Sequence, residues 1–108
     1  MVGTRDAQVL QVAYMFYIDD ESHAEIQKDG LFSLQEALTE LKARAEIPWD
    51  HEPNRAPCVG WMKCGRTYEI VEYDETKQPW EELRRFLALE VSAKGVKWSV
   101  DPDALDSH

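Results

Sequence analysis

The sequence is poor in positive charge and contains no long apolar run. Only 12 Lys and Arg residues stand against 21 Asp and Glu in 108 residues, so the net charge is −9. Nucleic-acid binding depends on clustered Lys and Arg, and the longest apolar run, Val12–Ile18, is far too short to cross a bilayer. We therefore predict no nucleic-acid partner and no membrane span. The acidic balance suits solubility, a basic protein partner or cation binding.

Cysteine is also scarce, and nothing in the sequence predicts export. The N-terminal residues lack the charged region and following apolar region of a signal peptide. We therefore predict a cytoplasmic protein in which Cys58 and Cys64 stay reduced. Hydrophobic residues make up 44% of the chain, enough for one domain over residues 1–108. Residues 1–7 and 101–108 are expected to be loose ends.

Runs of β-branched and aromatic residues predict the strands. Val9–Ile18 is apolar on both faces, which is typical of a strand in the interior of a sheet. The charged residues that follow predict an exposed connection over 21–30. A short strand is expected over Cys58–Met62 and a longer one over Arg66–Asp74.

The strand over Arg66–Asp74 does not alternate regularly. Tyr68 and Ile70 share one face, whereas Val71 and Tyr73 lie on the other. Either both faces are partly covered, or a bulge shifts the phase between Ile70 and Val71.

Ser33 and Glu36 form a capping-box pattern that marks the start of a helix. Phe32 and Ala37 stand where a hydrophobic staple would form. An apolar stripe at helical spacing follows, so we predict a helix over 34–46, ended by Pro48. The stripe consists of Leu34, Ala37, Leu38, Leu41 and Ala45.

The C-terminal third allows two interpretations. Pro79 suits the first position of a short second helix over 79–86. The favoured continuation is a hairpin of two strands, 87–91 and 96–100, joined at Gly95; the alternative extends the helix to Lys94. The fold class is therefore α+β, with an antiparallel sheet of about four strands and the main helix packed on one face.

His51, Cys58 and Cys64 are the candidate metal ligands. Zinc takes thiolate and imidazole ligands, but the five residues between the cysteines exceed the usual chelating spacing. A disulfide, or a Cys–His nucleophile pair with His51 as base, are further options. Two reduced, partly buried thiols are the ordinary explanation. We therefore predict no cofactor, with zinc as the alternative.

Two groups of carboxylates also qualify for chemistry. Asp19, Asp20 and Glu21 could hold Mg²⁺ or Ca²⁺, but neighbouring strand residues point to opposite faces, so we predict a solvated strand end. Glu72 and Asp74 share one strand face and could divide acid and base roles. An exposed face rich in charge explains them as well.

The four tryptophans are many for a small core. Trp49 and Trp61 flank a proline-containing loop, with Arg55 and Arg66 nearby, and these residue types dominate interface hot spots. They could also line a ligand cleft or cap the edges of the core.

We predict a small acidic, non-enzymatic protein-interaction or regulatory module that uses segment 49–66. A basic protein is the expected partner, and self-association is the other option. The alternative is a small metal- or ligand-binding protein or enzyme that uses Cys58, Cys64 and His51.

Overall fold

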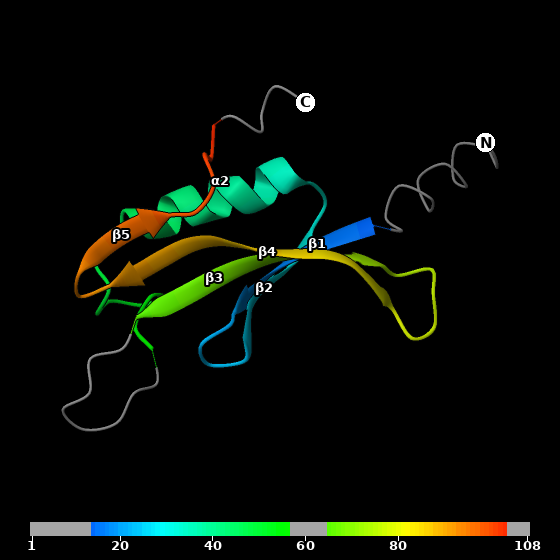
Figure 1. The fold of residues 1–108 in the computed structure, drawn as a ribbon, viewed down its shortest axis with the longest axis horizontal. Helices are drawn as coiled ribbons and strands as arrows, with labels where there is room; N and C mark the ends of the chain where they lie inside the picture. Colours follow the sequence, from blue (N-terminus) through cyan, green and yellow to red (C-terminus); the bar gives the residue numbers. More distant parts are fainter. Residues whose placement is uncertain (1–13, 57–64, 104–108) are drawn as a thin grey trace.

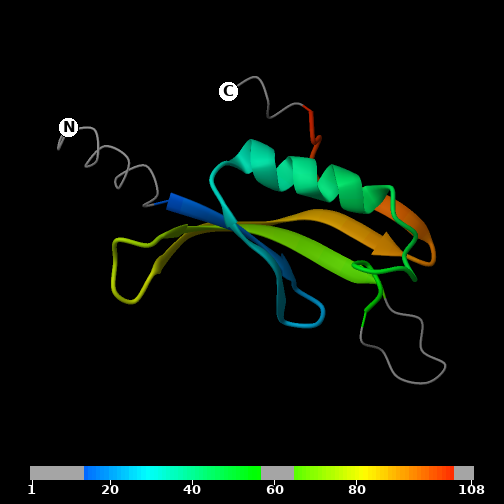
Figure 2. The same ribbon diagram turned by 180° about the vertical axis from the view of Figure 1, so that it is seen from behind.

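Five strands form one antiparallel sheet in the order β2-β1-β3-β4-β5, and one helix, α2, lies across one of its faces (Figures 1 and 2). The computed structural model describes residues 14–56 and 65–103. The elements are β1 (Tyr14–Asp20), β2 (Glu25–Leu31), α2 (Leu34–Ala45), β3 (Arg66–Asp74), β4 (Glu81–Ser92) and β5 (Gly95–Trp98). The predicted α+β class is confirmed, and the described residues contain one more strand than expected.

The helix forms where the capping box predicts it. The Ser33 Oγ accepts a hydrogen bond from the Glu36 amide at 3.1 Å. The Glu36 side chain accepts from the amide of Phe32 at 3.0 Å, instead of from Ser33. Phe32 is 58% exposed, whereas Ala37 is fully buried. Within the described residues, no helix is long and apolar enough to cross a membrane.

The core lies between α2 and the sheet. Each strand presents alternate residues to the helix, and the apolar stripe of α2 packs against them. The buried apolar residues of this core are Phe16, Ile18, Leu31, Ala37, Leu38, Leu41, Tyr68, Ile70, Ala88, Leu89 and Val91.

The pairing of β1 with β3 is continuous from Tyr14 opposite Asp74 to Asp20 opposite Tyr68. A bulge between Ile70 and Val71 is therefore wrong. Both residues are fully buried although they point to opposite faces of the sheet, so the Val71 side chain is shielded from solvent even on the face away from α2. Irregularities in the β3–β4 pairing lie elsewhere, between Tyr68 and Glu69 and between Glu72 and Tyr73.

The second helix expected over 79–86 is wrong. Residues from Glu81 onward belong to β4, which pairs with the whole length of β3. A short helix is only marginally stable by itself, whereas pairing along β3 satisfies the backbone and buries the apolar residues at the end of β4. Leu83, within the segment expected to be helical, is 44% exposed.

The predicted hairpin is confirmed. Ser92 pairs with Gly95, so Ala93 and Lys94 alone make the turn, and Gly95 takes a positive φ of 119°. The exposed connection expected over 21–30 is partly wrong, because 25–31 forms β2. The polar composition of β2 suits its place at the edge of the sheet. The strand expected over Cys58–Met62 lies outside the described residues.

Candidate functional site

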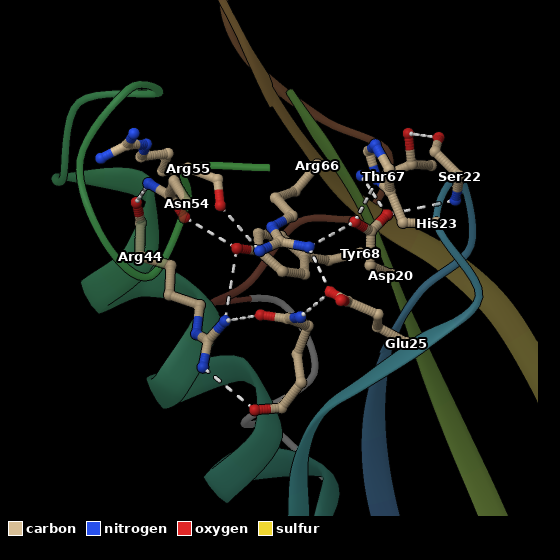
Figure 3. A network of polar contacts seen from close by, with 11 residues as sticks. Asp20, Ser22, His23, Glu25, Arg44, Asn54, Arg55, Arg66, Thr67 and Tyr68 are labelled. Atoms are coloured by element: carbon tan, nitrogen blue, oxygen red, sulfur yellow. Dashed lines mark hydrogen bonds and ion pairs between the residues drawn. The ribbon is translucent and has the colours of Figure 1, made fainter. Parts of the chain in front are cut away.

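Asp20 is the centre of a polar network on the helix side of the sheet (Figure 3). Its side chain is fully buried and accepts from Arg66 Nη1 at 3.0 Å and from the backbone amides of Ser22 and Thr67, each at 3.1 Å. His23 Nδ1 lies 2.6 Å from Oδ2, the oxygen that also accepts from Arg66. The guanidinium, the two amides and the imidazole together compensate the buried carboxylate. The solvated strand end predicted for Asp20 is wrong.

Arg66 connects three elements through the same network. Its guanidinium also donates to the Glu25 carboxylate and, at 2.8 Å, to the carbonyl of Arg55. Burial alone would lower the pKa of Arg66, but the hydrogen bonds that it donates to Asp20 and Glu25, and the charges of these carboxylates, outweigh burial and raise that pKa. Arg66 is 7% exposed. It therefore ties β3 to β1, β2 and the loop that follows α2.

Asn54 anchors that loop to the end of α2. Its Nδ2 donates to the carbonyls of Arg44 and Ile47 at 2.8 and 2.7 Å, and its Oδ1 accepts from the Tyr68 hydroxyl at 2.8 Å. The Arg44 guanidinium lies 5.2 Å from the centre of the Tyr68 ring. Asn54 thus joins the loop to two carbonyls at and just beyond the end of α2, and the Arg44 carbonyl also accepts from the amide of Ile47 at 3.1 Å.

The residues predicted as contacts do not form a common exposed surface among the described residues. Trp49 packs against the core and Arg66 is buried, whereas the Arg55 side chain is exposed. Trp61 lies outside the described residues.

The predicted metal site cannot be assembled from the described residues, because Cys58 and Cys64 lie outside them. His51 is exposed, with its Nδ1 3.6 Å from an Asp50 oxygen. The described residues contain no group of three His, Cys, Asp or Glu that could hold a metal ion. Asp19 and Asp20 lie on opposite faces of β1, as predicted, and do not converge.

Two hollows lie beside α2 and at the end of the sheet. The larger, of about 580 Å³, runs between β2 and α2, and the smaller, of about 350 Å³, adjoins His23 and Arg66. Gly65 is one of the residues that line the smaller hollow. It packs so closely against β4 that an added Cβ would lie 1.9 Å from the Val91 carbonyl oxygen. Of the described residues that the sequence predicted for a functional site, Arg66 alone lines one of these two hollows.

The face of the sheet opposite α2 is a different kind of surface, which we call the open face. No described element covers it (Figures 1 and 2). The strand register assigns its residues. They are Met15, Tyr17 and Asp19 on β1, Thr67, Glu69, Val71 and Tyr73 on β3, and Glu82, Arg85, Leu87 and Glu90 on β4.

Carboxylates dominate the middle of the open face. Arg85 donates to Asp19 at 3.2 Å, to Glu69 at 2.8 Å and to Glu82 at 3.1 Å. One guanidinium thus serves three acids, which leaves an excess of negative charge. Burial raises the pKa of Asp19 although Arg85 opposes the shift, and one oxygen of Asp19 has no partner among the described residues. The hydrogen bond with Glu69 is the largest cause that raises the pKa of Arg85.

Three aromatic rings, from Tyr17, Tyr73 and Trp80, gather at one end of the open face and form what we call the aromatic triad. The Tyr17 and Tyr73 centroids lie 5.2 Å apart at 89°, and Trp80 lies 6.0 Å from each. Trp80 is 46% exposed. The Tyr17 hydroxyl donates to Glu75 Oε2 at 2.9 Å. Burial, followed by the hydrogen bond and charge of Glu75, raises the pKa of Tyr17 to about 12.

The sequence interpretation did not connect these rings. Tyr17 was expected in a strand that is apolar on both faces and Tyr73 on the strand face opposite Tyr68, while Trp80 was expected in the helix over 79–86. The available signal was the alternation of both strands, which places Tyr17 and Tyr73 on the face opposite the core residues. Their contact with Trp80 depends on the turn before β4.

Comparison with protein-family models, curated proteins and solved structures found no match. Function must therefore be inferred from the chemistry of this chain's own surface.

Proposed function

We propose that this chain is a non-enzymatic interaction module whose open face binds a basic segment of another protein. The observation that carries the proposal is the aromatic triad beside carboxylates that outnumber the one arginine they share. Aromatic side chains supply binding energy at interfaces, and complementary charge selects the partner. A cytosolic location, expected from the sequence, belongs to this proposal.

This surface differs from the one expected over 49–66. Arg66 and Asn54 of that segment are buried in the polar network, and Trp49 packs against the core. Those side chains support the fold from the helix side. The open face instead presents aromatic, apolar and acidic groups along β1, β3 and β4.

Charge favours a basic partner over a second copy. Two copies would each carry a net charge of −9, and the same acidic surfaces would face each other in a symmetric dimer. Like charges across an interface are unfavourable. A lysine- or arginine-rich segment meets the opposite field and is steered toward it.

The alternative, a metal- or ligand-binding protein that uses His51, Cys58 and Cys64, remains a hypothesis. Metal analysis of the purified protein distinguishes the two. Zinc at one equivalent, lost in a Cys58→Ser/Cys64→Ser double variant, would support the alternative.

Titration of ¹⁵N-labelled protein with a lysine-rich extended peptide tests the proposal, with a glutamate-rich peptide of equal length as control. We expect saturable shifts at the amides of Met15, Glu69, Val71 and Tyr73, and none along α2. The affinity should fall with added salt.

Two neutralising variants provide a matched comparison. Glu82→Gln on the open face should weaken binding about two- to five-fold, as expected for one exposed charge. Glu52→Gln, in the loop after α2, should leave it unchanged. Equal binding of the acidic peptide, or shifts confined to α2 and its loop, would overturn the proposal.

A further inference from the structure

We propose that the aromatic triad and the Glu75 carboxylate bind one Lys or Arg side chain of the basic segment. This inference rests on the proposed function and names the anchor of the interaction. The anchor is a single organic cation, held by ring faces and a carboxylate together.

The spacing of the rings suits a cation. Because the three centroids lie 5.2 to 6.0 Å apart, a cation seated about 4 Å above their plane would lie within roughly 6 Å of every centroid, the range of cation–π attraction. The interplanar angles of 89°, 48° and 55° exclude parallel stacking. In the edge-to-face pair of Tyr17 and Tyr73, one ring covers one face of the other and leaves the opposite face outside that contact. Trp80, the strongest cation–π partner among side chains, is also the exposed member.

Glu75 adds the negative charge. It accepts from the Tyr17 hydroxyl through Oε2, which fixes the ring and increases its electron density. The other carboxylate oxygen can accept from an ammonium or guanidinium group. Burial is the largest cause of the raised pKa of Tyr17, and the hydrogen bond to Glu75 and the negative charges of Glu75 and Asp29 raise it further.

Two arrangements of this kind occur within the described residues. Arg84 lies 5.8 and 5.6 Å from the ring centres of Phe16 and Phe86 and donates to Glu72 at 2.9 Å. Arg44 lies over Tyr68. In both, a cation meets an aromatic face, and within the described residues no Lys or Arg occupies that position at the triad. A basic side chain from a partner would complete the same chemistry there.

A small-molecule titration tests the anchor without the partner. The probe is tetramethylammonium chloride, with neopentyl alcohol as a neutral compound of similar shape and NaCl as the ionic control. The indole N–H resonance of Trp80, assigned by its loss in Trp80→Leu, should shift with millimolar affinity. The alcohol should bind at least about five-fold more weakly, because it lacks the cation–π term.

Four variants locate the effect. Tyr73→Leu should reduce the affinity for tetramethylammonium about five-fold, and Glu75→Gln about two-fold; Trp80→Leu should abolish the shifts at neighbouring amides. Tyr14→Leu, an exposed tyrosine of β1 outside the triad, should change nothing. An amide spectrum of each variant verifies that it is folded.

The outcomes separate the inference from the proposed function. If neopentyl alcohol binds as well as the cation, the triad is an apolar contact and the inference is overturned. If the lysine-rich peptide binds the open face but leaves Trp80 unshifted, the function stands and the anchor is wrong. If tetramethylammonium binds the triad and no peptide binds, the cation site stands and the proposed partner class is wrong.

Discussion

Arg66 Nη1 donates to Asp20 Oδ2 across β3 and β1 at 3.0 Å, and the two side chains are 7% and 0% exposed. This buried pair holds the end of the sheet where β2 and the loop after α2 meet. Asp20 is the last residue of β1, directly before the turn into β2. The pair therefore fixes the start of that turn on the helix side of the sheet. The opposite face of β1 remains available for contact.

Breaking the Asp20–Arg66 pair should be costly. We expect Asp20→Asn and Arg66→Met each to lower the free energy of unfolding by about 3–5 kcal/mol, since each leaves a buried partner uncompensated. Urea unfolding measures this. The double variant should cost less than the sum of the two, whereas strictly additive losses would show that the pair does not act as a unit.

Asn54 should matter more than its place in a loop suggests. Asn54→Ala removes two hydrogen bonds to the end of α2 and one from Tyr68, and we expect a loss of about 2–3 kcal/mol. Tyr68→Phe, which removes only the hydroxyl, should cost about 1 kcal/mol. A loss below about 0.5 kcal/mol for Asn54→Ala, measured by urea unfolding, would show that Asn54 does not anchor the loop to the end of α2.

Gly65 is required by contact with neighbouring backbone. A Cβ at this position would lie 1.9 Å from the Val91 carbonyl oxygen, so Gly65→Ala must displace β3 from β4. We expect a loss of at least about 3 kcal/mol or failure to fold. Gly30→Ala is the control: an added Cβ there has nothing within 4 Å, and the positive φ of 69° should cost only about 1–2 kcal/mol. Similar losses for both would contradict the close packing.

Alkaline pH should destabilise the protein through Tyr17. Its pKa is about 12 in the folded protein against 10.0 for the unperturbed group, so the unfolded chain loses this proton first. Stability therefore falls as pH rises from about 10 toward 12. Tyr17→Phe should show a smaller decline between about pH 9 and about pH 11 in urea unfolding; the remaining slope includes Tyr68, whose pKa burial also raises. An unchanged slope would contradict the shift.

Local patterns were sufficient to predict several elements. The capping box located the start of α2, the alternation of residues 87–100 indicated the last hairpin, and the bounds of β3 were as expected. In each case a short-range signal agreed with the tertiary structure. β2 and the first half of β4 were missed because their polar or charged residues gain strand structure only by pairing with β1 and β3.

The candidate site was harder to predict for a related reason. Arg66 looked like a contact residue in sequence, yet a buried Asp20, 46 positions away, determines its place. The aromatic triad likewise joins Tyr17 with Tyr73 and Trp80 through strand register. Such contacts depend on the order of strands in the sheet, which local periodicity does not specify.

Site-directed photo-crosslinking in the protein's own cell lysate tests the central claim most directly. A benzophenone amino acid would replace Leu87, which lies on the open face outside the aromatic triad, or, as control, the exposed Phe32 just before α2. We expect a crosslinked protein from position 87 only, attached through a segment rich in Lys or Arg and competed by the lysine-rich peptide. Crosslinks from position 32 alone, or an acidic segment at position 87, would contradict binding of a basic partner to the open face.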